Sequence, residues 1–188
     1  TEEERDFFSA ADPAGYILFQ RNCVEPEQLK ALTADLRGIS GRADLPILID
    51  QEGGRVARMQ PPHWPVFPAG WEFADLYAKA PTSAIEAARA NARALALMLR
   101  ECGINVDCLP LLDVRQPGAS DVIGDRALGS EPMQVAALGR AVLAGLARAG
   151  VTGCIKHMPG HGRARADSHK ELPRIEASEA ELREARGA

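Results

Sequence analysis

The sequence predicts an α/β protein built around a parallel sheet, because short apolar runs alternate with longer segments of helical periodicity. Polar residues follow nearly every apolar run, and functional groups at the carboxyl ends of several strands are typical of a (β/α)₈ TIM barrel. A doubly wound Rossmann sheet would instead concentrate its signal in one GxGxxG turn, and the sequence contains none. We therefore predict a TIM barrel, with strands at residues 15–19, 46–49, 104–107 and 151–155 and helices at residues 26–39, 83–102 and 131–149.

Start and stop signals support these helices. Pro26 suits the first position of a helix. Ser83 and Glu86 have the spacing of a capping box, so the second helix is expected to begin at Ser83. Gly103 and Gly150 follow the second and third helices and suit left-handed positions after a helix end.

The length of the chain limits how much of a barrel it can form. A complete TIM barrel needs about 250 residues, whereas this chain has 188 residues. We expect one partial TIM-barrel catalytic domain over residues 1–188, covering roughly the first half to two-thirds of the barrel. The strand that opens the barrel is expected to precede Thr1, and a further helix is expected at 178–185. The proline-rich residues 61–68 are expected to form an ordered loop that walls the site.

Composition excludes several classes of protein. A net charge of −4 and a pI near 5.6 argue against a nucleic-acid-binding surface. No apolar run approaches the roughly 18 residues of a membrane span, and no signal peptide is visible. The four cysteines show no CxxC motif and no tight metal spacing, which indicates reduced thiols in a reducing compartment.

The densest group of titratable side chains lies on the loop after the last expected strand. Asp167 and His169 are two positions apart and could touch within a tight loop. An aspartate that holds an imidazole fixes its tautomer and raises its basicity. We therefore predict that His169, assisted by Asp167, is a general acid/base. Lys156 and His157 leave the preceding strand together, so strand alternation points them to opposite sides unless the strand has already ended.

The other histidines of this loop allow two further interpretations. His157 and His161 have the spacing of a helical zinc pair, but Pro159 and Gly160 interrupt a helix between them. A barrel metallohydrolase built on His157, His161 and His169 is one alternative. In the other, the histidines only hydrogen-bond the backbone of a rigid loop.

Two more segments carry candidate binding residues. The segment DQEGGRVAR at 50–58 follows the second strand, and its acid and arginines could form a polar cup for a hydroxylated ligand. The alternative is a turn with a structural ion pair, and its glycine pair indicates a sharp turn. Arg126 is a candidate donor to a substrate carboxylate or carbonyl, or else pairs with Asp125 or Asp121 at the surface.

Four motifs occur in order along the chain: DQEGGR at 50–55, INVD at 104–107 with Pro110 and LDV at 112–114, IGDR at 123–126, and KHMPGHG at 156–162 with DSH at 167–169. Together they resemble the bacterial β-N-acetylglucosaminidases of glycoside hydrolase family 3, from about Gly15 to Pro173. The histidine-bearing loop is the specific part, because family members that act on glucosides or xylosides usually lack it.

The resemblance implies a TIM barrel and retaining hydrolysis of terminal β-linked N-acetylglucosamine, in many bacteria during cytoplasmic peptidoglycan recycling. The substrate would be an N-acetylglucosamine-containing saccharide or muropeptide, and no metal or organic cofactor is implied. We further expect a monomer without a nucleic-acid or membrane partner. By position, His169 would be the acid/base with Asp167, and the sugar contacts would be Asp50, Arg58, Arg126, Lys156 and His157.

One part of the family pattern is missing. In this family the nucleophile is an aspartate in a Ser-Asp-Asp-Leu-like segment on a later strand, and no such segment occurs in the sequence. A retaining enzyme needs an acid/base and a nucleophile on either side of one bond. We therefore expect the chain to carry most of the sugar site and the acid/base but not the nucleophile. A fragment that binds amino sugar without cleaving it is the alternative function.

Overall fold

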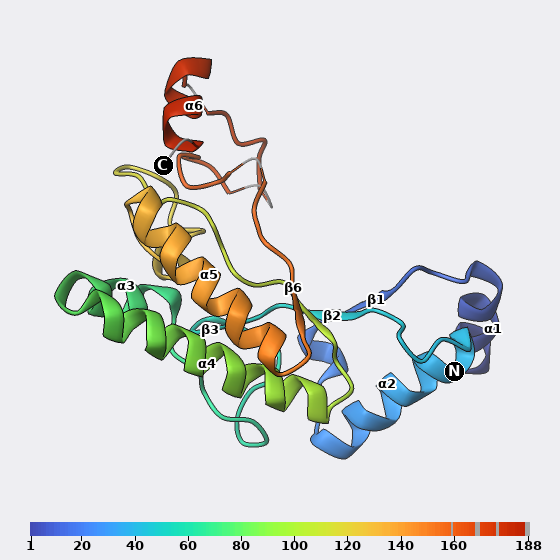
Figure 1. Cartoon of the computed structure of the whole chain (residues 1–188). Coiled ribbons are helices and arrows are strands. Elements are labelled where there is room, and N and C mark those ends of the chain that lie inside the picture. The colour runs from blue at the N-terminus through green and yellow to red at the C-terminus, as the bar shows by residue number, and fades with distance from the viewer. Residues whose placement is uncertain (159, 168–169, 176, 187–188) are drawn as a thin grey trace.

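The computed structural model describes residues 1–158, 160–167, 170–175 and 177–186. Its centre is a parallel sheet with the strand order β1–β2–β5–β6 (Figure 1). The strands are short: β1 (Tyr16–Leu18), β2 (Ile47–Ile49), β5 (Val106–Asp107) and β6 (Thr152–Gly153). Helix α2 (Pro26–Ser40) lies between β1 and β2 in the chain, α4 (Pro81–Glu101) precedes β5, and α5 (Pro132–Arg148) precedes β6. The predicted alternation of strands and helices around a parallel sheet is confirmed.

One predicted helix start is wrong. Helix α4 begins at Pro81, so Ser83 lies inside its first turn and does not form a capping box with Glu86. Proline presets the φ angle of a first helical residue and lacks only an N–H that has no partner there, which favours Pro81 in this position. The predicted left-handed residues are confirmed, because Gly103 and Gly150 both have a φ of 76°.

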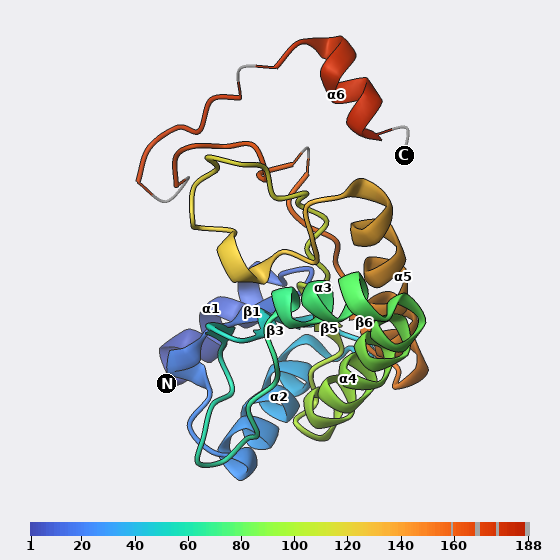
Figure 2. The ribbon, with the colours of Figure 1, turned by 90° about the vertical axis from the view of Figure 1, so that its left-hand side faces the viewer.

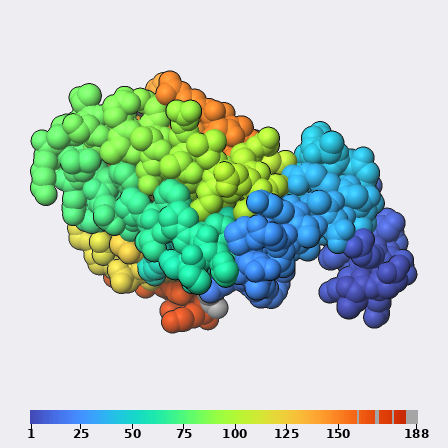
Figure 3. Space-filling model, turned by 90° about the horizontal axis from the view of Figure 1, so that it is seen from below, coloured from blue at the N-terminus to red at the C-terminus, as the bar shows by residue number. Residues whose placement is uncertain are grey.

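Several elements have no counterpart in the sequence prediction. They include α1 (Glu2–Ala11), α3 (Gly70–Lys79) and the hairpin of β3 (Gln51–Gly53) and β4 (Val56–Ala57). Helix α1 has no fully buried residue, and its Phe8 is only partly buried against the core, so its apolar pattern is short and weak. Figure 3 shows α1, in dark blue, at one side of the molecule. At the other end of the chain, α6 (Glu179–Arg186) confirms the expected last helix.

The core lies between the sheet and the helices that cover one of its faces. Ile47 and Ile49 of β2 are fully buried and belong to one apolar cluster with Leu95 of α4. Burying each such side chain contributes about 1.5–3 kcal/mol. Helices α4 and α5 pack side by side (Figure 1), and a Cβ at Gly145 would lie only 2.4 Å from the carbonyl oxygen of Arg89. This close packing holds the strands in place beneath their carboxyl-terminal loops.

The long loops that follow β5 and β6 gather at one end of the sheet (Figure 2). They are held to each other by backbone hydrogen bonds, from Gln116 to Gly162 at 3.0 Å and from Ser120 to Ala164 at 2.8 Å. No helix in the part of the chain that the structure describes is both long enough and apolar enough to cross a membrane.

The glycine pair of the β3–β4 hairpin makes the predicted sharp turn. Gly53 and Gly54 have φ angles of 92° and 56°, in the left-handed region. A Cβ at Gly53 would lie 2.3 Å from the carbonyl oxygen of Pro68. The N–H of Gly54 donates to the carbonyl of Phe67 at 2.9 Å. The hairpin therefore packs directly against the proline-rich loop, and only glycine fits at this contact.

We expect Gly53→Ala to lower the free energy of unfolding by at least about 2 kcal/mol, because left-handed strain adds to the collision with Pro68. Urea unfolding followed by circular dichroism measures the loss. Gly41→Ala is a matched control, because Gly41 has a φ of 68° but its Cβ would meet nothing within 4 Å. The control should lose only about 1 kcal/mol. Equal losses in the two variants would contradict the packing argument.

Candidate active site

Five charged side chains meet at the end of the sheet where β2 and β6 finish. Asp50 follows β2, Lys156 follows β6, and Arg126 ends the short 3₁₀ helix η2 (Gly124–Arg126). The hairpin contributes Glu52 from β3 and Arg58 just after β4. We call these residues the Asp50 cluster. Carboxyl ends of parallel strands are the usual place for active sites in α/β proteins, and the structure brings four of the candidate binding residues, Asp50, Arg58, Arg126 and Lys156, together there.

Lys156 and the two carboxylates form the centre of the Asp50 cluster. Nζ of Lys156 lies 2.9 Å from Oδ1 of Asp50 and 2.5 Å from Oε1 of Glu52. Arg126 forms a two-bond pair with Glu52, with both N–O distances 2.8 Å. Nη2 of Arg58 donates to Oδ2 of Asp50 at 3.2 Å. Three cations thus face two carboxylates, which leaves an excess of positive charge.

The neighbouring charges keep Asp50, Lys156 and Arg126 ionised. Burial alone would raise the pKa of Asp50, but the hydrogen bonds and charges of Lys156 and Arg58 outweigh it and lower that pKa. Burial would likewise lower the pKa of Lys156, but Glu52 and Asp50 raise it. The pKa of Arg126 is also raised, because Glu52 outweighs the effect of burial. All three groups are therefore charged at neutral pH.

The members of the Asp50 cluster differ in how accessible they are. The side chain of Glu52 is only 4% exposed, whereas those of Asp50 and Arg58 are 20% and 28% exposed. Nε of Arg58 is buried and has no hydrogen-bond partner within the described ranges. A ligand can therefore reach Asp50 and Arg58, while the buried Glu52 pairs with Arg126 and Lys156.

A second polar group lies beside the first. Asp113, whose side chain is fully buried, lies 2.6 Å from Nδ1 of His157 through its Oδ2, and its Oδ1 accepts from the backbone N–H of His161. Burial would raise the pKa of Asp113, but the hydrogen bonds from these two residues lower it. An ionised carboxylate only accepts hydrogen bonds, so this network assigns the proton to Nδ1 of His157 and leaves Nε2 as an acceptor without a hydrogen bond to the described residues.

Lys156 and His157 are consecutive residues after β6, but they contact different polar groups. Lys156 reaches Asp50 and Glu52, whereas His157 reaches Asp113. The ring of His161 packs against that of His157 with centroids 6.2 Å apart. Both ring nitrogens of His161 are buried without a hydrogen-bond partner among the residues that the structure places. The predicted divergence of Lys156 and His157 is therefore confirmed.

Two expectations about arginines are corrected. Arg126 pairs with Glu52, and the alternative partners Asp125 and Asp121 instead contact Arg55. Arg55 was expected in the polar cup, but it lies at the tip of the hairpin. Its Nε donates to Asp125 at 2.7 Å and its Nη2 donates to the carbonyl of Asp121 at 2.7 Å. It ties the hairpin to the segment before η2 and does not contact Asp50 in this structure.

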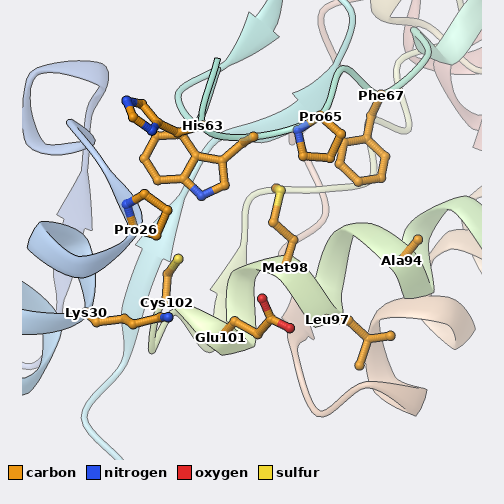
Figure 4. Close-up of a pocket in the computed structure, with 11 residues that line it drawn as sticks. Pro26, Lys30, His63, Pro65, Phe67, Ala94, Leu97, Met98, Glu101 and Cys102 are labelled. Carbon is orange, nitrogen blue, oxygen red and sulfur yellow. The ribbon is translucent and has the colours of Figure 1, made fainter. Parts of the chain in front are cut away.

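The proline-rich loop does not wall the Asp50 cluster in the way the sequence suggested. Four of its residues line a pocket of about 410 Å³ between α2 and α4 (Figure 4). Trp64 is almost completely buried there, and Phe67 and Met98 lie close by. Apolar side chains of the loop are better buried against α4 than left at the polar end of the sheet. The loop contacts the site only indirectly, through Gly53 and Gly54.

The predicted acid/base pair is only partly described. His169 lies outside the described residues, so its placement relative to Asp167 stays a prediction. The carbonyl of Asp167 accepts from the backbone N–H groups of Lys170 and Glu171 at 2.9 and 3.0 Å, which forms a tight turn. No three potential metal ligands come together within residues 1–158, 160–167, 170–175 and 177–186. His169 lies outside these residues, so the metallohydrolase built on His157, His161 and His169 stays an alternative.

Sequence reasoning missed three buried acids of this site. Glu52 and Asp113 hold the basic residues described above, and Asp107 at the end of β5 is fully buried. Oδ1 of Asp107 accepts from the backbone N–H of Gln51 at 3.0 Å, and no partner for its Oδ2 occurs in the described part of the chain. Their position near the ends of expected strands could have indicated them. An acid that is buried there needs a hydrogen-bond or charged partner.

Asp107 is expected to make stability depend on pH. Burial raises its pKa well above the usual 3.8, only partly offset by the Gln51 N–H and by Lys156. A raised folded-state pKa stabilises the fold at low pH, and this contribution is lost as pH rises through the folded pKa. Asp107→Asn keeps the acceptor and cannot titrate, so its stability relative to wild type should increase as the pH rises above the usual aspartate pKa of 3.8. Urea unfolding midpoints at a series of pH values measure this difference in stability, and Asp44→Asn, at an exposed position, is the control. If the stability of Asp107→Asn and of wild type changed with pH in the same way, the assignment would be contradicted.

Comparison with known proteins identifies the family. Residues 1–188 match the glycosyl hydrolase family 3 N-terminal domain. A β-hexosaminidase from Bordetella avium is 40% identical over 173 residues, which cover 92% of this chain and 49% of that protein. A β-hexosaminidase from Aromatoleum aromaticum is 41% identical over 174 residues, covering 92% of this chain and 48% of its own length. The chain therefore belongs to glycosyl hydrolase family 3, and it spans about half the length of these curated relatives.

Solved structures agree with this assignment. NagZ from Neisseria gonorrhoeae, in complex with N-trifluoroacetyl-D-glucosamine, superposes with a TM-score of 0.90 at 39% identity, over 98% of this chain and 54% of that one. A family 3 β-N-acetylglucosaminidase from Paenibacillus gives a TM-score of 0.87 at 33% identity, over 97% of this chain and 34% of that one. The predicted TIM-barrel fold, of which this chain forms a part, is confirmed by these likenesses.

Proposed function

We propose that this chain supplies the sugar site and the acid/base of a retaining β-N-acetylhexosaminidase that releases terminal β-linked N-acetylglucosamine. The observation that carries the proposal is the Asp50 cluster at the strand ends, in a chain that belongs to family 3. The gonococcal relative in complex with a glucosamine derivative supports an amino-sugar ligand. As proposed, residues 1–188 are one partial catalytic domain.

Each accessible group has a role that its chemistry supports. The ionised Asp50 accepts hydrogen bonds from two sugar hydroxyls, and Arg58 donates from the exposed part of its guanidinium. Lys156 and Arg126 donate to further sugar oxygens from positions fixed by Glu52. His157 offers Nε2, because Asp113 occupies its Nδ1. These donors and acceptors suit a neutral, hydroxyl-rich ligand.

In the proposed reaction, His169, assisted by Asp167, protonates the glycosidic oxygen while a carboxylate attacks the anomeric carbon. The bond from that carbon to the leaving oxygen breaks, and a glycosyl ester forms. Water then attacks the same carbon, gives its proton to His169 and releases the carboxylate. The attacking aspartate is expected in a Ser-Asp-Asp-Leu-like segment that this sequence does not contain.

We propose a peptidoglycan fragment as the natural substrate, cleaved during cytoplasmic cell-wall recycling. A hollow of about 550 Å³ beside the histidine loop is lined by Arg163, Arg165 and Arg174, with Glu171 as its acid. Guanidinium groups suit the carboxylates that a muropeptide carries. We further propose a monomer that uses no cofactor and has no nucleic-acid or membrane partner.

The test compares aryl β-N-acetylglucosaminide with aryl β-glucoside as substrates. A chimera that joins this chain to the second half of the Bordetella avium relative supplies the segment expected to hold the nucleophile. Release from the N-acetylated substrate, at a rate at least about a hundredfold above that from the glucoside, is expected. Equal rates on both, or loss of activity with a chelator, would contradict the proposal and favour another hydrolase.

The alternative function is amino-sugar binding without cleavage. It applies to residues 1–188 taken alone, because a glycosyl ester cannot form without the carboxylate of the nucleophile segment. The 188-residue chain alone is then expected to bind N-acetylglucosamine and to release no aryl group. Hydrolysis by the unextended chain would contradict this alternative.

A further inference from the structure

Gln51 is a buried glutamine whose side chain is fully occupied within the hairpin. It is 1% exposed. Its Oε1 accepts from the backbone N–H groups of Arg58 and Met59 at 2.8 and 3.0 Å, and its Nε2 donates to the carbonyl of Met59 at 3.0 Å. One side chain thus makes three hydrogen bonds to two consecutive backbone residues, and we call this arrangement the Gln51 clasp.

Backbone pairing between the two strands fixes little of the second half of the hairpin. Strand β4 contains only Val56 and Ala57, and the pairing register shifts between Gln51 and Gly53. The backbone of Arg58 lies just beyond this short ladder. The Gln51 clasp therefore sets where the Arg58 backbone lies, and it is itself fixed because the Gln51 N–H donates to Asp107.

The position of Arg58 matters because it faces the open side of the site. Its side chain is 28% exposed, its Nη2 donates to Asp50, and its guanidinium lies 6.0 Å from the centre of the Phe19 ring. A donor that is held in position before the ligand arrives binds with a smaller loss of entropy. Anything that fixes the Arg58 backbone therefore affects sugar affinity.

We infer that Gln51 is a positioning residue for sugar binding, acting through the Gln51 clasp on Arg58. It touches no ligand itself, since its polar atoms are all used inside the hairpin. The inference rests on the proposed sugar site and adds a determinant of affinity at a buried, uncharged side chain.

Titration calorimetry with N-acetylglucosamine tests the inference first on three single variants. Gln51→Met has similar length but makes no hydrogen bonds, and it should weaken binding about tenfold. Gln51→Glu keeps an acceptor for the Arg58 N–H and should retain most of the affinity. Gln60→Met is the matched control, because Gln60 is an exposed glutamine of the same segment whose side chain bonds to Ala57 and Gln20. Circular dichroism verifies that each variant is folded.

A double-mutant cycle separates positioning from a general structural role. In an Arg58→Ala background, Gln51→Met should change affinity less than about twofold, because the group it positions is already gone. An equal loss in both backgrounds would overturn the inference, as would unchanged binding by Gln51→Met in the unmodified background. Failure of the unmodified chain to bind the sugar at all would instead overturn the proposed function.

Discussion

Glu52→Ala is expected to lower the free energy of unfolding by about 3–5 kcal/mol, the usual cost of breaking a buried ion pair. The side chain of Glu52 is 4% exposed, and those of its partners Arg126 and Lys156 are 12% and 13% exposed. Removing the carboxylate leaves two buried cations that repel each other. Urea unfolding measures the loss, and sugar affinity should fall with it, because both cations are proposed sugar contacts.

The control for Glu52 is an ion pair of the same hairpin that is open to solvent. Arg55 and Asp125 are 47% and 49% exposed, so Asp125→Ala should cost less than about 1 kcal/mol. A loss for Glu52→Ala as small as this control would show that water or another group compensates the cations. It would contradict the claim that Glu52 holds Lys156 and Arg126 in place within the Asp50 cluster.

His169→Ala is expected to reduce turnover by two or more orders of magnitude, the usual scale for loss of a general acid/base. The loss should be smaller for a substrate with an acidic aryl leaving group, because such a group leaves with little protonation. Steady-state kinetics on the chimera described above measure both effects. His63→Ala is the control, because His63 is exposed and lines the pocket between α2 and α4. A near-normal rate for His169→Ala would contradict the assignment.

The sequence was sufficient for the parts of the fold that local patterns determine. The apolar run before Asp50 marked β2, and Gly103 marked the end of α4 through its left-handed φ. Helix α1 was not predicted, because it has no fully buried residue. The predicted capping box at Ser83 was wrong because α4 already begins at Pro81. These differences arise where two local signals compete or where a helix has no fully buried residue.

The sequence predicted several residues of the site, but not which acid pairs with which basic residue. Arg126 was a candidate from sequence, yet its partner Glu52 lies 74 positions away, while Asp125 beside it was the nearer acid. Asp113 and His157 are separated by 44 positions. Only the packing of the strands brings such groups together, so no spacing rule could select the right acid.

The most direct test of the central claim is calorimetric titration of the chain with N-acetylglucosamine, repeated with Asp50→Ala. The account predicts saturable binding of one sugar per chain, lost or weakened at least about tenfold in Asp50→Ala, because the variant removes an ionised acceptor at the accessible side of the cluster. Glucose should bind more weakly than N-acetylglucosamine. No binding to the unmodified chain, or equal binding to Asp50→Ala, would contradict the assignment of the Asp50 cluster as the sugar site.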